Sequence, residues 1–307
     1  MLSNKQWVGT LAGCLALTLP LCASGWAWTS GSHYTYGVEG VLGATPPPPG
    51  WHYRMYNLWY TPDELKDNSG NTVPGNFELD VFASVQRIIH VTDVKILGAD
   101  YFYDVIIPLV DQEFTSGSFS DSHSFTLGDI TLEPFALAWR QPRWDASFAL
   151  AVIVPTGHFE GDEPASPGLG YWSGMMTVGG TLYLDDQKTW SASVLTRTLI
   201  NGEQEDTDIT PGSEFVAEYG IGKEFQVNSS LMIRPGLTGA SYWQFSDDSD
   251  EAGAAADQHK KAHALGAEVN VFYLPMLCQV NLRYLQEYGV DNGPEDARFV
   301  ATLTKSW

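Results

Sequence analysis

The chain has 307 residues and a formal net charge of −21 at pH 7, and it contains 30 Gly, 17 Pro, 11 Trp, 14 Tyr and 14 Phe. Its 16 scattered Lys and Arg residues cannot form the basic surface that a phosphate backbone needs, so nucleic-acid binding is excluded. No leucine-rich helical stretch follows the N-terminus, and the composition indicates one β-rich domain.

Residues 1–27 have the pattern of a secretory signal peptide. Lys5 precedes an apolar run from Trp7 to Leu21, and small residues follow. The run of about 15 residues is shorter than the ~20 that a spanning helix needs, and no comparable run occurs later, so helical membrane insertion is excluded. One alternative is a lipoprotein box, Leu-Ala-Gly-Cys, that would make Cys14 an acylated first residue. After ordinary cleavage a single cysteine, Cys278, remains, and we interpret it as a small apolar strand residue.

Residues 28–51 form a separate segment before the first predicted strand. It contains four consecutive prolines, Pro46, Pro47, Pro48 and Pro49, and prolines lack the N–H donors that a strand interior requires. Two interpretations stay open. The segment is either a periplasmic leader that merely starts the following domain, or a plug or gate folded into the interior of that domain, with these prolines as its gate candidates.

The remaining residues show repeated windows in which apolar and polar side chains alternate. This period-two pattern is typical of strands with one apolar and one polar face. In one window, Phe77, Leu79 and Val81 alternate with acidic residues, and in another the alternation runs from Trp144 to Val154. Such windows predict twelve strands, at 52–60, 77–90, 97–108, 125–140, 144–155, 171–184, 189–200, 213–226, 229–245, 261–274, 277–289 and 297–307.

The connections between the predicted strands alternate in length. The long ones are 61–76, 109–124, 156–170, 201–212 and 246–260, and the short ones are 91–96, 141–143, 185–188, 227–228 and 275–276. Bacterial outer-membrane barrels show this alternation, with long loops outside the cell and short turns in the periplasm. The sequence therefore predicts an all-β fold, a transmembrane antiparallel up-and-down β-barrel of about 12 strands over residues 52–307, with both termini on the periplasmic side.

In such a barrel the apolar face of each strand contacts lipid and the polar face lines the lumen. An Arg on the lipid face at mid-depth would cost ~2–4 kcal/mol, and this cost decides which face is which. The lumen-facing candidates are Glu78, Asp80, Arg143, Asp145, Arg197, Glu218, Glu268 and Arg283. A soluble β-sandwich or lipocalin-like barrel, which buries its apolar face inward, is the alternative that strands of ten or more residues and recurring charges disfavour.

The last predicted strand ends on an aromatic residue. Phe299, Leu303 and Trp307 fall on one face, and this pattern resembles the signal for insertion into the outer membrane. It implies the barrel-assembly machinery as a partner, together with outer-membrane lipid and lipopolysaccharide. The expected location is the cell outer membrane.

Several short segments, in this order and spacing, resemble one known family. They are Glu39-Gly40, the proline run followed by Gly50 and Tyr56, Gly98-Ala99-Asp100-Tyr101, Pro108-Leu109-Val110, Gly128-Asp129-Ile130, Pro134-Phe135-Ala136-Leu137-Ala138-Trp139, Pro155-Thr156-Gly157 and Tyr171-Trp172. The sequence is similar to Gram-negative outer-membrane proteins named for the meta-pathway of phenol degradation and often described as transporters. The resemblance spans nearly the whole mature chain and implies uptake of aromatic or other hydrophobic compounds.

The sequence carries little sign of catalysis. Ser173 lies between glycines, but with the wrong spacing for a nucleophile elbow, Gly-x-Ser-x-Gly. The sequence contains no His-x-His pair among its histidines, which include His90, His123, His158, His259 and His263. We therefore expect no enzyme, no cofactor and no metal site.

The expected function is passive passage of a small hydrophobic ligand, aromatic compounds among them, through the outer membrane. Two alternatives stay open: a structural or adhesive barrel that acts through acidic extracellular loops, and an outer-membrane lipid-modifying enzyme.

Overall fold

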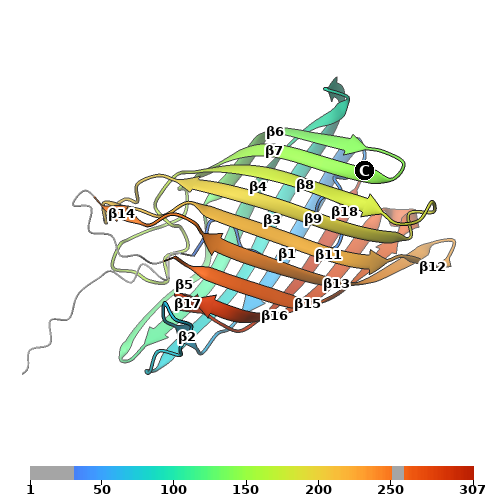
Figure 1. Ribbon diagram of the computed structural model, residues 1–307. Helices are drawn as coiled ribbons and strands as arrows, with labels where there is room; N and C mark the ends of the chain where they lie inside the picture. Colours follow the sequence, from blue (N-terminus) through green and yellow to red (C-terminus); the bar gives the residue numbers. More distant parts are fainter. Residues whose placement is uncertain (1–30, 251–258) are drawn as a thin grey trace, which may run out of the picture.

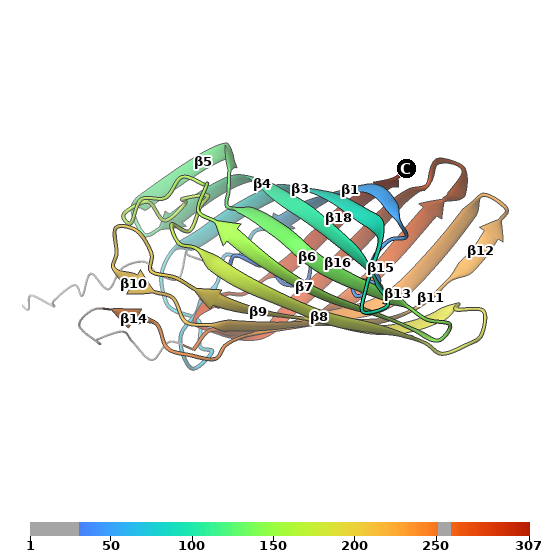
Figure 2. The same ribbon diagram turned by 90° about the horizontal axis from the view of Figure 1, so that it is seen from above.

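The computed structural model describes residues 31–250 and 259–307, so the predicted signal peptide and Cys14 lie outside the described residues. Across the described ranges the strands form one closed antiparallel barrel, in which β1 (Gly50–Tyr60) pairs with the last strand, β18 (Ala297–Ser306) (Figures 1 and 2). None of the helices found in these ranges is long and apolar enough to cross a membrane. The predicted fold class is confirmed.

Twelve strands of the described chain make up the barrel wall. Between β1 and β18 these are β3 (Phe77–Ile96), β4 (Ala99–Ser116), β6 (Ile130–Arg140), β7 (Trp144–Val154), β8 (Ser173–Tyr183), β9 (Trp190–Asn201), β11 (Glu214–Lys223), β13 (Leu231–Gln244), β15 (Lys261–Tyr273) and β16 (Cys278–Asp291). All twelve overlap the predicted windows.

Short elements lie at the two ends of the wall. At the end with the long connections, β2 (Leu65–Lys66) pairs with β17 (Gly293–Pro294), and β10 (Ile209–Thr210) pairs with β14 (Ser249–Asp250). At the other end, the short-turn end, β12 (Phe225–Asn228) pairs with β13, and a 3-10 turn, Leu274–Met276, joins β15 to β16. Figure 1 shows the long-loop end on the left and the C-terminus at the short-turn end on the right.

Two predicted connections are wrong. The expected turn at 91–96 is strand, because β3 continues to Ile96 and the chain reverses at Leu97 and Gly98, both with positive φ. The expected loop at 109–124 is instead a hairpin of β4 with β5 (Phe119–Leu127), which Figure 2 shows at the long-loop end. β5 is mostly polar and half-exposed or exposed along its length, so it lacks the apolar face on which the period-two signal depends.

The outer face of the wall is apolar over most strands. Its exposed side chains include Leu150, Met176, Val178, Leu182, Val194, Ile221, Leu237, Leu265, Leu282 and Tyr284. Phe299 and Trp307, predicted as part of the insertion signal, are exposed, and Leu303 is half-exposed. Because an apolar outer surface is stable only against lipid, this belt is what a membrane-spanning barrel requires.

Residues 31–49, which we call the inner segment, lie inside the barrel and run along its length. His33 contacts Asp129, which directly precedes β6, while Pro47 accepts a hydrogen bond from Arg140, the last residue of β6. The described chain therefore starts at the long-loop end, passes down the lumen and enters β1 at the short-turn end. The expectation that both termini lie at the short-turn end is wrong for the start of the described chain.

Candidate functional site

A cavity of about 360 Å³ occupies the long-loop half of the lumen. Much of its wall is apolar and comes from β1, β3, β4, β7 and β8: Leu58, Leu79, Val81, Ala83, Val85, Ile106, Pro108, Val110, Ile153 and Met175. On β3 these are alternate residues, so the inner face of that strand presents aliphatic side chains to the lumen from Leu79 to Val85. Such a surface favours apolar molecules over hydrated ones.

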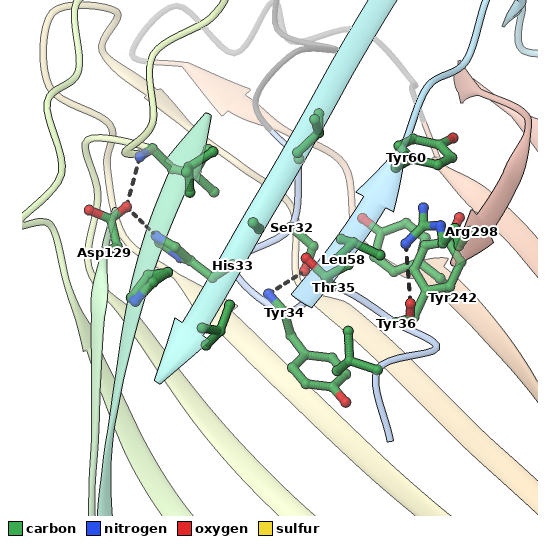
Figure 3. Close-up of a pocket in the computed structure, with 18 of the residues that line it drawn as sticks. Ser32, His33, Tyr34, Thr35, Tyr36, Leu58, Tyr60, Asp129, Tyr242 and Arg298 are labelled. Carbon is green, nitrogen blue, oxygen red and sulfur yellow. Dashed lines mark hydrogen bonds and ion pairs between the residues drawn. The ribbon is translucent and has the colours of Figure 1, made fainter. Parts of the chain in front are cut away.

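Aromatic rings line the other side of this cavity, which we call the upper cavity. Tyr36 of the inner segment stacks on Tyr242, with ring centroids 5.6 Å apart. The guanidinium of Arg298 lies over the rings of Tyr36 and Tyr60, at 3.9 and 4.4 Å from their centroids. Figure 3 shows these four side chains grouped at one side of the pocket. The rings and the aliphatic wall together enclose a space suited to a small apolar or aromatic molecule.

A second cavity of about 310 Å³, the lower cavity, occupies the short-turn half. Its lining carries many polar and charged side chains, with Arg54, Arg234, Glu268, Asn270, Asn281, Arg283, Thr302 and Thr304 among its residues. Glu39 lines both cavities. The inner segment therefore separates a more apolar space from a more polar one at Glu39.

Glu39 joins the inner segment to three strands of the wall. Its Oε2 lies 3.2 Å from Nη1 of Arg54, and its Oε1 accepts a hydrogen bond of 2.9 Å from Tyr56. The same Oε1 lies 3.5 Å from Arg87 Nη1 and 3.7 Å from Arg197 Nη2. The Glu39 side chain is 6% exposed, so the carboxylate is held almost entirely by wall side chains. Glu39 was not among the site residues predicted from the sequence, although Glu39-Gly40 was one of the segments that carried the family resemblance.

The backbone of the inner segment is hydrogen-bonded by charged wall residues. Glu218 accepts N–H bonds from Gly37 and Glu39, at 2.7 and 3.1 Å, and Glu268 accepts one of 3.1 Å from Val41. Arg283 donates to the carbonyl of Gly37 at 3.0 Å. These bonds replace the ladder partners that an irregular segment lacks, so the lumen holds the segment in one conformation.

The structure places five of the eight lumen-facing candidates on the inner face. Arg197, Glu218, Glu268 and Arg283 are buried around the inner segment, and Arg197 pairs with Glu218 while Arg283 pairs with Glu268. Asp145 is buried on β7 and accepts a hydrogen bond of 2.5 Å from Tyr183.

The other three candidates lie elsewhere, which corrects the prediction. Glu78 and Asp80 are exposed, because on β3 it is Phe77 and Leu79 that point inward. Both acidic residues lie where β3 pairs with the end of β4, at the long-loop end, and a charge near the membrane edge costs little. Arg143 lies in a short turn, because β7 begins only at the next residue. Its Nη1 lies 2.5 Å from Oδ1 of Asp186.

The four gate candidates lie at the short-turn mouth. Pro46, Pro47 and Pro48 line the lower cavity, while Pro48 and Pro49 are exposed. The carbonyl of Pro48 lies 2.8 Å from Nε2 of His52, and the carbonyl of Pro47 accepts from Arg140. The proline run is thus tied to β1 and β6 at the point where the segment leaves the lumen.

His33 fastens the other end of the segment. Its Nδ1 lies 2.7 Å from Ser173 Oγ and its Nε2 lies 3.0 Å from Asp129 Oδ2, the contact drawn in Figure 3. Asp129 also accepts N–H bonds from Gly157 and Leu169. These three residues resemble a serine hydrolase triad, but the Ser173 hydroxyl donates to Asn201 Oδ1 at 2.6 Å. Its proton is therefore not directed at the imidazole, and the arrangement works as a clamp.

We expect His33→Ala to loosen the front of the inner segment without unfolding the barrel. The variant removes two buried hydrogen bonds, each worth about 0.5–1.5 kcal/mol and more where a carboxylate accepts. Hydrogen exchange in detergent should show faster exchange at residues 34–39 and unchanged exchange in β7 to β9. His259→Ala, which removes an exposed histidine in contact with Asp247, is the control. Equal protection in His33→Ala and the native protein would contradict the clamp.

A family model described as "Putative MetA-pathway of phenol degradation" matches residues 62–303. The chain belongs to this family. The match covers most of the barrel and confirms the resemblance predicted from the sequence. It includes ten of the twelve wall strands in full and β18 up to residue 303, and it leaves out the inner segment and β1. Members of the phenol-degradation family are thus recognised by the wall of the barrel, and the location in the outer membrane follows from the barrel and its apolar belt.

Solved structures show the same fold at low sequence identity. An outer membrane channel from Pseudomonas putida F1 is 16% identical, with a TM-score of 0.72, over 90% of this chain and 100% of that one. The β domain of a Bordetella autotransporter is 11% identical, with a TM-score of 0.53, over 85% of this chain and 100% of that one. No curated protein sequence gives a significant match.

Proposed function

We propose that this member of the phenol-degradation family is a passive channel that takes small hydrophobic molecules, aromatic ones among them, across the outer membrane. One observation carries the proposal: the upper cavity is walled by an aliphatic face of β1, β3 and β4 and by tyrosine rings. Porins that pass hydrophilic solutes have a polar interior instead. The similar fold of a channel from Pseudomonas putida F1 supports the proposal.

We infer that residues 31–49 act as a plug with a polar gate at Glu39. The contacts of Glu39 to Arg54, Tyr56, Arg87 and Arg197 close the section between the two cavities. A molecule that enters the upper cavity would have to displace part of this segment, or leave the lumen, before it reached the lower cavity. The proline run, fixed at the opposite mouth, would act as the hinge.

The test is uptake into cells. Gram-negative host cells that express the native chain should accumulate labelled toluene or phenol faster than cells with an empty vector. The assay is run under conditions in which passage through the outer membrane limits the rate. A labelled sugar of similar size serves as the control, and its uptake should not rise. Equal accumulation with and without the protein, across a panel of aromatic and aliphatic compounds, would overturn the proposal.

The partners proposed for assembly follow from the exposed aromatic end of the wall. We propose that Phe299, Leu303 and Trp307 are read by the barrel-assembly machinery, and that lipopolysaccharide surrounds the long-loop end. We also propose that the protein is not an enzyme, because Ser173, which has a histidine and an aspartate nearby, belongs to the clamp.

A further inference from the structure

We infer that the long-loop end of the barrel carries a site for a Zn²⁺-class transition-metal ion, formed by His123, His158 and Glu163. His123 lies on β5, and the other two residues lie on the loop between β7 and β8, which we call the mouth loop (residues 156–170). Each of the three residues offers one ligand atom, and these atoms all lie within 4.8 Å of one another.

Both imidazoles point at the same carboxylate oxygen. Nε2 of His123 lies 3.2 Å from Oε2 of Glu163, and Nε2 of His158 lies 2.8 Å from the same atom. The two rings are 5.2 Å apart between centroids. In a tetrahedral zinc site with metal–ligand bonds of ~2.0–2.2 Å, neighbouring ligand atoms are ~3.3 Å apart. The two contacts with Glu163 are close to this value. The ligand nitrogens of the two histidines lie within 4.8 Å of each other, so the rings would have to adjust to hold one ion between them.

The donor set selects the class of metal. Two imidazole nitrogens and one carboxylate oxygen suit Zn²⁺ and its neighbours, whereas Ca²⁺ and Mg²⁺ require six or more oxygen ligands or several waters. A fourth position can be filled by water or by Glu160, whose Oε1 lies 4.0 Å from His158 Nε2.

An ion at this position would connect two elements that border the upper cavity. The mouth loop supplies Ser166, Pro167 and Leu169 to the cavity wall. It already touches the β4–β5 hairpin, because Ala165 donates its N–H to Asp121 at 2.8 Å. Coordination by His123 on one side, and by His158 and Glu163 on the other, would replace the His123–Glu163 contact by metal–ligand bonds and hold the loop against the hairpin. An ion at this site would order the mouth loop against the β4–β5 hairpin, and this role does not depend on which molecule the lumen carries.

The sequence could not show this site. His123 and Glu163 are 40 positions apart, and His158 and Glu163 are five positions apart on an irregular loop. No zinc motif with fixed spacing is present. Only the hairpin of β4 and β5, which replaces a predicted loop, brings His123 to the mouth loop.

The experiment is a ZnCl₂ titration of the purified full-length barrel, without a polyhistidine tag, in detergent and against a chromophoric zinc chelator. We expect one equivalent of Zn²⁺ to bind, and the variants His123→Ala, His158→Ala and Glu163→Gln each to lower the affinity about tenfold or more, since even loss of supporting contacts costs this much. His259→Ala removes another exposed histidine, outside the proposed site, and should leave the affinity unchanged. Heat-dependent migration on a gel shows that each variant is a folded barrel.

A second readout separates coordination from unspecific binding. Zn²⁺ should slow hydrogen exchange in the mouth loop and in β5 of the native protein, and it should not do so in the double variant His123→Ala/His158→Ala. MgCl₂ is the control ion and should change neither segment. Native and double-variant proteins that bind Zn²⁺ equally well, or a native protein that binds none at micromolar concentration, would overturn the inference.

Discussion

A barrel that lacks residues 31–45 should conduct ions on the order of tenfold better than the native protein, because a twelve-strand wall without its filling leaves a water-filled lumen. Single-channel recording in planar lipid bilayers measures this directly. The wall itself should still form, since its strand pairings run from β1 to β18 and the inner segment contributes no strand.

A milder variant, Glu39→Gln, complements this deletion because it keeps the length and shape of the segment and removes one charge. Arg54 would lose its nearest carboxylate, and loss of one partner from a buried charge pair costs about 2–5 kcal/mol. We expect this variant to have the low conductance of the native protein most of the time. Brief openings should reach at most the conductance of the deleted form. Identical traces for the native protein, the Glu39→Gln variant and the deleted form would show that the segment does not obstruct the lumen.

A carboxylate in the aliphatic wall should slow the uptake of an apolar molecule. Ala83 lines the upper cavity, between Val81 and Val85 on the inner face of β3. In Ala83→Asp, an apolar molecule would have to pass a hydrated charge, and stripping water from an unpaired polar group costs about 1–3 kcal/mol. We therefore expect toluene uptake to fall about tenfold, which corresponds to about 1.4 kcal/mol.

Two variants test whether the loss depends on polarity and on position. Ala83→Val keeps the wall apolar, and it should retain most of the uptake if side-chain volume is not the cause. Thr304→Asp places the same charge in the lower cavity, where the lining is already polar, and should have a smaller effect. Uptake that is equally reduced in all three variants would point to misassembly, and unchanged uptake in Ala83→Asp would remove the apolar wall from the route.

The twelve strands could be predicted because membrane strands are long and their apolar face is continuous. Windows such as 144–155 and 261–274 match β7 and β15 within two residues. The faces were harder to assign. On β3, alternate apolar residues line the lumen, and the period-two pattern is identical whichever face is turned inward. The rule that charges avoid lipid misplaced Glu78 and Asp80, because it weakens at the rim of the barrel.

The site itself could be predicted only in part. Arg197, Glu218, Glu268 and Arg283 were found as inward charges, since each sits at a polar position of a clear alternating strand. Their partner, the inner segment, has no period of its own, and its contacts join residues far apart in the chain. Glu39 meets Arg197, and His33 meets Ser173, only because the strands curve into a closed ring. These contacts depend on closure of the barrel, and no sequence spacing predicts them.

The inner segment also bears on how the barrel is completed. The carbonyl of Tyr36 accepts a hydrogen bond from Arg298, 262 positions later and on the strand that closes the ring against β1. Residues that precede the first strand are therefore anchored by the strand that finishes the wall. Before β18 is in place, the barrel would lack both the β1–β18 pairing and the Arg298 contact that holds the inner segment. Closure of the wall and obstruction of the lumen would therefore be completed in the same step.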